Sequence, residues 1–516
     1  MKNLPLSATA ILLLAFTSVP VSGQRAQNIS ERSYRSARRI LDRGLQALGG
    51  IEAFRKVDDI SLKSTARWSE IGQSANPDAP YDVRQEELTR IFDLRGGRSY
   101  RDQKTEFRGG SPYWGRQILK DKDSFLLDVN SNVAYPVNTF AVGGSIRSAQ
   151  RRIPHLLLQM ALNRAGTLRS LGSFRLGGEL HHVITFADGN GAQIALYFDA
   201  RSNLLNKYET LGDDPILGDA LGETSFADYR DIGGVKIPFR VIFKYAGELI
   251  FDQTYSEVRI NTRPSDKLFA MPLDVKQGPE ILGPTSVSLR RLADDVYFVN
   301  GINSGDVWFY SQMFVVFKDY VLVVEAPLNN DISKAVVAKI ESVSAGKPIR
   351  YLIPTHYHTD HIGGVREYIA KGATVVTTPG NQTFIEQIIG KEHSIRPDSL
   401  PLNHREPAIE VFRDRRVFKD QQHEVELYNI GPSPHVDEIV VVYLPREKIL
   451  FVSDLMMTRM VEPFTPPTVT EKDFVEKLRR LNLNVETIAN GHGWVGTMEE
   501  FLRVLEDQRG RKGVCP

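Results

Sequence analysis

The sequence has a single cysteine, Cys515, among its 516 residues. No intrachain disulfide can therefore form. An excess of either charge is lacking too, because 64 Lys and Arg stand against 63 Asp and Glu. The formal net charge of +1 gives no reason to expect a nucleic acid or a membrane surface as a partner. We expect a small-molecule substrate instead.

A long apolar run is also lacking. The apolar segment near the N-terminus, Ala8 to Phe16, is too short to span a bilayer. Lys2 precedes this segment, and the small residues Val21-Ser22-Gly23 follow it. The pattern predicts a signal peptide over residues 1–23. We therefore expect an exported protein, periplasmic or secreted, without a transmembrane anchor.

The rest of the chain is too long for one domain of ordinary size, so two are expected. Residues 276–286 contain Gly278, Pro279, Gly283 and Pro284. Glycine and proline at this density predict a linker. The predicted domains are therefore residues 24–275 and residues 287–516.

The first domain carries mostly strand signals. Short alternations of apolar and polar residues fill the stretch from 58 to 262, separated by glycine-rich turns. Helices are expected at two places: after the N-cap residue Ser30, ending at Gly49-Gly50, and from Pro154 to Asn163. The pattern predicts a mainly antiparallel β domain, in the form of a curved sheet or half-barrel.

The strongest chemical signal is the segment Thr-His-Tyr-His-Thr-Asp-His at 355–361. It follows the mostly apolar run Ile349 to Ile353, which predicts a buried strand. His356 and His358 are two residues apart in extended chain, so they point the same way. Asp360 and His361 follow where the chain turns. Such a cluster can hold two metal ions, with one pair of side chains facing each ion.

Three further candidates lie downstream, each in a turn at a strand end. One precedes the predicted strand 439–444, one ends the apolar run 449–453, and one sits in a Gly-His-Gly turn after 485–489. Metal sites in layered α/β folds gather at one edge of a sheet in this way. The predicted metal ligands are His356, His358, Asp360, His361, His435, Asp454 and His492.

The order of these motifs resembles the metallo-β-lactamase superfamily: His-x-His-x-Asp-His, a lone His, an Asp after an apolar strand, then Gly-His-Gly. The resemblance covers roughly Val287 to Gln508. It implies an αββα sandwich, in which two sheets pack face to face with helices outside. The predicted fold class is therefore α/β in the C-terminal domain, after the β domain.

The resemblance also implies a distribution of the ligands. His356, His358 and His435 would hold the first metal, and Asp360, His361 and His492 the second. Asp454 would bridge both ions. The superfamily usually has an Asp at the end of an early strand that steadies the histidine loop, whereas here the matching run 321–324 ends in Glu325.

Nitrogen and oxygen ligands without a thiolate suit two Zn²⁺ ions best, with iron or manganese as alternatives. A hydroxide bridging two metals could attack a carboxylic ester, lactone, thioester or lactam. Asp360, besides binding metal, could accept a hydrogen bond from the hydroxide and orient it, so we assign it the catalytic role. The prediction is a binuclear metal-dependent hydrolase.

Two other functions stay open. An iron centre in the same ligands could support oxygen chemistry, which would make the protein an oxygenase or oxidoreductase of the same superfamily. Alternatively, the N-terminal β domain could bind a ligand, with the metal site secondary. Zinc in the purified protein favours hydrolysis, whereas iron with oxygen uptake favours the first alternative. Ligand binding that survives replacement of the metal ligands favours the second.

The sequence after Asp454 bears on the substrate. In many β-lactamases of the superfamily a Lys lies a few residues beyond this ligand and binds the carboxylate of the drug. Here no cation occurs until Arg459. A less charged, more apolar wall favours an ester or lactone without a fixed anion.

Overall fold

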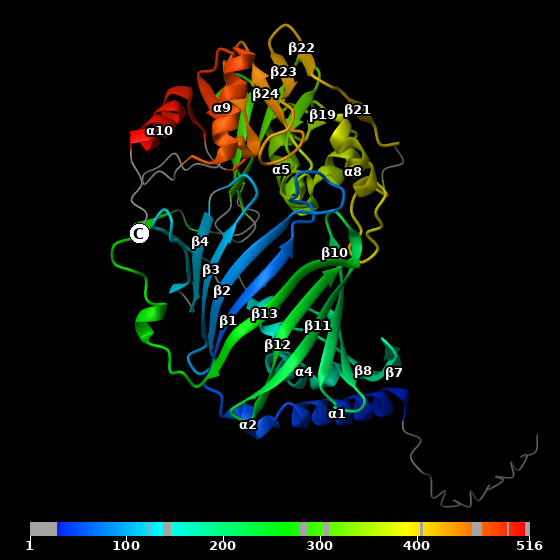
Figure 1. Cartoon of the computed structure of the whole chain (residues 1–516). Helices are drawn as coiled ribbons and strands as arrows, with labels where there is room; N and C mark the ends of the chain where they lie inside the picture. Colours follow the sequence, from blue (N-terminus) through cyan, green and yellow to red (C-terminus); the bar gives the residue numbers. More distant parts are fainter. Residues whose placement is uncertain are drawn as a thin grey trace, which may run out of the picture.

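The computed structural model describes residues 28–110, 112–120, 123–137, 146–278, 280, 287–303, 309–402, 406–456, 467–492 and 495–510. The predicted signal peptide, most of the predicted linker, Arg459 and Cys515 lie outside these ranges. Two parts make up the structure, a β-rich N-terminal part and a mixed α/β C-terminal part (Figure 1). No helix among the described residues is long and apolar enough to cross a membrane.

The N-terminal part is built on one open sheet of 14 strands, with β14 and β7 at its edges. Apart from the short parallel contact of β14 with β6, the strand pairs are antiparallel, as expected. The strands are β1 (Asp59–Ser69), β2 (Val83–Asp93), β3 (Arg98–Glu106), β4 (Pro112–Leu119), β5 (Phe125–Asp128), β6 (Val133–Pro136), β7 (Arg169–Leu176), β8 (Glu179–Ala187), β9 (Gln193–Asp199), β10 (Leu205–Asp214), β11 (Gly218–Ile232), β12 (Val235–Tyr245), β13 (Glu248–Ile260) and β14 (Lys276–Gln277).

Helices close one side of this sheet. They are α1 (Ile29–Ala47), α2 (Ile51–Arg55) and α4 (Pro154–Asn163), the last with the predicted bounds. Leu41 of α1 and Leu157 of α4 are fully buried in one cluster with Leu196 and Phe198 of β9. Alternation along β9 sends every second side chain to this core. The helices therefore cover the apolar face of the sheet.

The cap of α1 differs from the prediction. Asn28, not Ser30, is the N-cap, and its side chain accepts a hydrogen bond of 2.7 Å from the backbone N–H of Glu31. Asn is at least as good a cap as Ser, so the helix begins earlier. Its end is as predicted, because Gly49 has a φ of +119°, which continues no helix.

The C-terminal part contains two sheets. The first, in spatial order, comprises β15 (Ser288–Ala293), β16 (Val296–Asn303), β17 (Phe309–Val316), β18 (Val321–Val324), β19 (Ile349–Ile353), β20 (Thr374–Thr377) and β21 (Ile409–Val411). The second comprises β22 (Arg415–Lys419), β23 (Glu424–Asn429), β24 (Val440–Leu444), β25 (Ile449–Phe451), β26 (Thr487–Ala489) and β27 (Val495–Thr497).

Among the described residues of this part, six α-helices accompany the sheets: α5 (Asn330–Val343), α6 (Thr359–Ile362), α7 (Val365–Ala370), α8 (Pro379–Ile389), α9 (Val469–Leu481) and α10 (Met498–Gly510). One apolar cluster joins the inner faces of both sheets, from Leu322 on β18 to Val442 on β24. A second packs the outer face of the first sheet on α5, α7 and α8, and a third packs the second sheet on α9 and α10. These layers confirm the predicted αββα sandwich.

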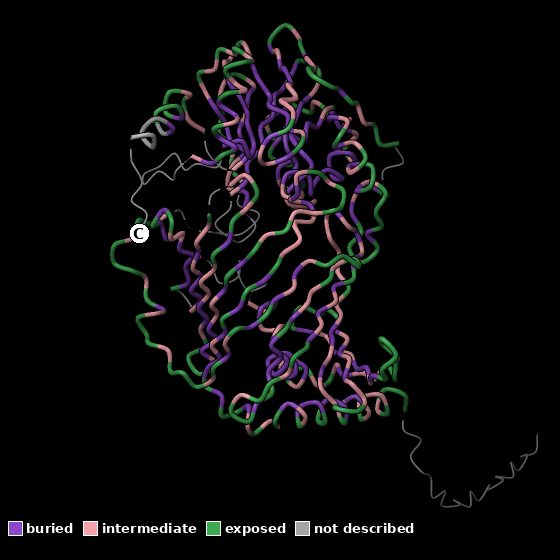
Figure 2. The backbone as a smooth tube through the Cα atoms, in the orientation of Figure 1, coloured by how far each residue is buried: buried purple, intermediate pink, exposed green. Residues whose placement is uncertain are grey.

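Strand β18 shows why both faces of the first sheet are apolar. Leu322 and Val324 enter the cluster between the sheets, whereas Val321 and Val323 face the helices. All four side chains are fully buried. A strand covered on both faces reads as a continuous apolar run, and buried residues are concentrated in this part of the molecule (Figure 2).

Two loops of the N-terminal sheet reach the C-terminal part. Residues 70–82, between β1 and β2, contact the histidine segment, where the N–H of Thr359 donates to the carbonyl of Gly72 at 3.1 Å. The turn between β10 and β11 places Ile216 in the cluster of the first C-terminal sheet. Asp213, near the end of β10, has Oδ1 2.6 Å from Nδ1 of His393. The two parts therefore share packed and hydrogen-bonded contacts.

A buried histidine makes the stability of the N-terminal part depend on pH. His155 on α4 stacks on Phe54 at 4.8 Å, and burial lowers its pKa to about 4 despite a hydrogen bond to the carbonyl of Leu48. A histidine pKa depressed by burial costs no stability above pH about 6.5, where both states are neutral, but the cost grows as the pH falls toward 4 because the unfolded chain binds the proton first. The loss should be on the order of 3 kcal/mol.

We expect urea denaturation of the wild type, followed between pH 8 and 4, to show this loss, and His155→Leu to lack it. The difference between the two proteins isolates His155 from the other histidines. Parallel pH curves for wild type and variant would contradict the assignment.

Candidate metal centre

The predicted ligands gather at one edge of the sandwich. Strands β18 and β19 are parallel neighbours in the first sheet, and β25 and β26 are parallel neighbours in the second. The carboxyl ends of parallel strands meet at the same sheet edge. The loops after these strands carry Glu325, the 355–361 segment, Asp454 and His492, and the loop before β24 adds His435.

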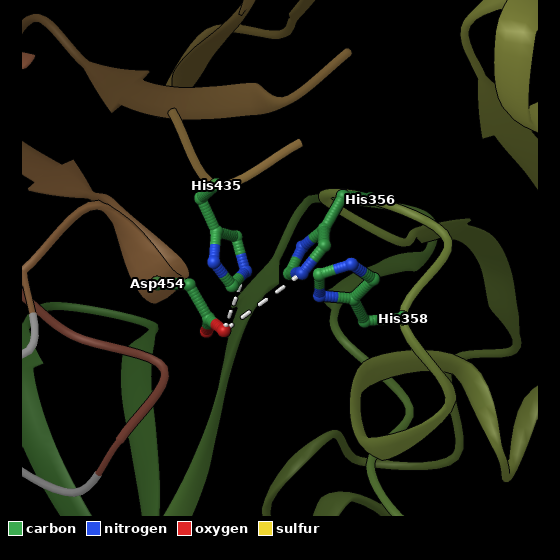
Figure 3. A group of neighbouring side chains, drawn as sticks. All are labelled: His356, His358, His435 and Asp454. Carbon is green, nitrogen blue, oxygen red and sulfur yellow. Dashed lines mark ion pairs between the residues drawn. The ribbon is translucent and has the colours of Figure 1, made fainter. Parts of the chain in front are cut away.

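His356, His358, His435 and Asp454 form a first group, in which one potential ligand atom of each lies within 4.8 Å of the others. Figure 3 shows His356 and His358 on one side and His435 and Asp454 on the other, all directed at a common centre. Oδ2 of Asp454 lies 3.0 Å from Nε2 of His435 and 3.9 Å from Nε2 of His356. Three imidazoles and a carboxylate suit tetrahedral zinc.

Asp360, His361 and His492 form a second group with the same spacing. The other oxygen of Asp454 faces this group: Oδ1 lies 2.8 Å from Nε2 of His361 and 2.9 Å from Nε2 of His492. Asp454 thus turns one oxygen toward each group. This is the arrangement that a carboxylate bridging two ions requires. All seven predicted ligands are therefore brought together.

The residues fit a pair of metal ions. Four buried ring nitrogens have no hydrogen-bond partner of acceptable geometry among the described residues: His356 Nε2, His358 Nδ1, His361 Nε2 and His435 Nε2. Buried polar atoms in proteins are nearly always satisfied. Imidazole nitrogens that make no hydrogen bond and lie around a shared carboxylate can bind a metal cation.

The two groups differ in protonation. Burial, helped by the neighbouring His435, lowers the pKa of His358 to about 3, and burial next to His361 holds the pKa of His356 well below its ordinary value. Burial also disfavours a charged His361, but Asp454 and Asp360 outweigh it and raise the pKa of His361. His492 is raised in the same way, because Asp454 outweighs burial. Metal binding at the second group must therefore displace protons.

Glu325 contacts the residues that carry the candidate ligands. Its buried carboxylate accepts hydrogen bonds from the hydroxyls of Thr355 and Ser453, the latter at 3.0 Å, and lies 3.3 Å from Nδ1 of His361. The residue has a φ of +75°, an uncommon conformation for a side chain of this size. The side chain of Gln312 donates to its carbonyl and helps to hold it there. Glu325 therefore reaches the histidine loop despite its extra methylene.

Two residues of the 70–82 loop complete the site from the N-terminal part. Nε2 of Gln73 donates to Oδ1 of Asp360 at 2.6 Å, and the carbonyl of Ser74 lies 2.8 Å from Nε2 of His358. A carbonyl only accepts, so His358 carries its proton on Nε2 and leaves Nδ1 for a metal. Nothing in the sequence around Gln73 or Ser74 indicates this role, because the contacts are entirely long-range.

The part of the chain that carries this site is similar to known proteins. Residues 333–492 match the family model described as the metallo-beta-lactamase superfamily. A metallo-beta-lactamase type 2 of Elizabethkingia meningoseptica is 25% identical over 166 residues, which is 32% of this chain and 60% of that protein. The chain thus spans less than two thirds of that relative.

Among solved structures, a metallo-beta-lactamase from Pontibacter korlensis is 18% identical, with 44% of this chain and 100% of that chain covered and a TM-score of 0.33. One from Hirschia baltica is also 18% identical, with coverages of 43% and 97% and the same TM-score. The family match confirms the predicted resemblance: the C-terminal half is similar to the hydrolases of the metallo-beta-lactamase superfamily.

The contact between Gln73 and Asp360 can be tested by metal binding. Gln73→Ala removes the donor that fixes Asp360, so we expect the weaker of two metal-binding steps to lose about tenfold in affinity. Competition with a chromophoric chelator measures both steps. Gln85→Ala, a change of the same kind at an exposed position on β2, is the control. Unchanged binding in Gln73→Ala would contradict the role.

Proposed function

We propose that the C-terminal part is a binuclear metal-dependent hydrolase that cleaves a carboxylic ester, lactone, thioester or lactam. The observation that carries the proposal is the position of Asp454, with one oxygen on each group of ligands at 2.8 to 3.0 Å. Two ions bound there would supply a hydroxide at neutral pH and polarise the carbonyl of the substrate. We further propose, from residues 1–23, that the protein is exported.

The residues of the proposed centre have different roles. His356, His358 and His435 would hold one ion, Asp360, His361 and His492 would hold the other, and Asp454 would serve both. Gln73 donates to Oδ1 of Asp360, whereas Oδ2 lies 3.6 Å from Nε2 of His361 in the second group, where it would bind metal and orient the attacking water. Glu325 and the Ser74 carbonyl keep the histidine rings in place.

Ligands of nitrogen and oxygen favour zinc, whereas the alternative of oxygen chemistry requires iron in the same residues. Elemental analysis of the purified protein separates the two. We expect about two zinc ions per chain. Iron as the main metal, together with oxygen consumption, would support the oxygenase instead.

The ligand assignment predicts the effect of two single changes. His356→Ala or His435→Ala should lower metal content and reduce kcat/KM by more than about 100-fold, because each removes a nitrogen from the first group. His182→Ala, on β8 and bonded to Ser173, is a control outside the site. Turnover at the wild-type level in either ligand variant would refute the assignment.

The absence of a cation directly after Asp454 predicts the substrate preference. We expect kcat/KM for some ester or lactone to exceed that for any β-lactam by at least about tenfold, or about 1.4 kcal/mol in transition-state binding. A panel of esters, lactones, thioesters, penicillins and carbapenems measures it. Efficient hydrolysis of β-lactams without esterase or lactonase activity would contradict this prediction.

A further inference from the structure

A second set of charged residues lies in the N-terminal sheet, apart from the metal ligands. A cavity of about 350 Å³ is bounded by strands β1 to β4 and by residues 148–152, which precede α4. Three of its lining residues are arginines: Arg90, Arg101 and Arg152. The volume is within the range of small-molecule sites, about 300 to 1,000 Å³.

The register of the sheet brings two of these charges face to face. Arg90 on β2 is the direct partner of Arg101 on β3, and Arg101 is the partner of Gln117 on β4. All three side chains line the cavity. Like charges directly opposite each other in an antiparallel pair are destabilising. A negative charge placed between them would offset this cost.

The cavity wall does not supply enough of that charge. Glu86 is the one carboxylate among the lining residues that the structure describes, and it is shared with Arg84 at 3.8 Å and with the side chain of Gln103. Residues 138–145, just before this wall and outside the described ranges, contain no Asp or Glu. Arg152 rests on the ring of Phe251, 4.2 Å away. The described residues that line the cavity therefore carry three positive charges and one negative charge.

Two hydrogen-bond donors in the wall are also unused. Nε1 of Trp68 and Nε of Arg101 are buried and have no hydrogen-bond partner among the described residues. Unsatisfied buried donors are rare because they are costly. Burial and the neighbouring Arg101 also lower the pKa of Arg90 to about 9, which a bound anion would reverse.

We propose that this cavity binds a small organic anion, whose carboxylate or phosphate oxygens accept hydrogen bonds from Arg90, Arg101 and Arg152. The planar guanidinium group suits both kinds of anion. The apolar part of the ligand lies against Trp68 and Leu88. This site goes beyond the proposed hydrolase and gives the N-terminal sheet a recognition function of its own.

Calorimetry on the full chain with three probes tests the proposal: phenyl phosphate, benzoate and the uncharged benzamide. We expect at least one anion to bind once per chain, and benzamide not to bind. The ratio of the two anion affinities distinguishes a phosphate ligand from a carboxylate ligand. Arg90→Gln and, from the opposite wall, Arg152→Gln should each weaken binding by about tenfold or more, because a hydrogen bond to a charged group is lost.

Arg67→Gln is the matched control, because Arg67 is exposed on β1 next to Trp68 and does not line the cavity. It should bind like the wild type. Without ligand, Arg90→Gln should melt no earlier than the wild type, since it removes one of two facing charges. Three results would each overturn the proposal: no binding of either anion, undiminished binding in both cavity variants, or binding lost in His356→Ala but kept in Arg90→Gln.

Discussion

The buried carboxylate of Asp454 is the interaction on which the proposed centre depends. It is 3% exposed and touches four histidines, two through each oxygen. His356 and His361 lie in the segment after β19 of the first sheet. Asp454 and His492 lie in the segments after β25 and β26 of the second sheet. The centre can therefore form only when the apolar cluster between the sheets is packed. Each charge shifts the pKa of the other: Asp454 raises the pKa of His361, and His361 lowers the pKa of Asp454, although burial disfavours both charged forms.

The gathering of the candidate ligands at one edge could be predicted from the sequence because their signals are local. Histidines and aspartates directly after apolar runs point to strand ends, and strand ends meet at one edge. The helix at 154–163 and the glycine stop at Gly49 were equally local. The cap differs from the prediction because two cap-forming residues, Asn28 and Ser30, lie two positions apart, and the backbone geometry decides between them. The roles of Gln73 and of the Ser74 carbonyl depend on contacts across almost 290 residues of sequence, which no local pattern encodes.

The N-terminal sheet contributes to two proposed sites, the metal centre and the anion cavity. Its 70–82 loop supplies a donor to Asp360 and an acceptor to His358, so both parts of the chain contribute to the candidate metal centre. Its arginine-lined cavity lies at Trp68, just before that loop. A sheet that only supported the sandwich would have no reason to place Arg90 opposite Arg101. That pair is the feature on which the proposed anion site rests.

The central claim is that two metal ions lie on either side of Asp454. Anomalous diffraction from a crystal of the zinc-loaded protein, recorded at the zinc absorption edge, tests it most directly. The account predicts two peaks, one among His356, His358 and His435 and the other among Asp360, His361 and His492, with Asp454 between them. A single peak, or peaks away from Asp454, would contradict it.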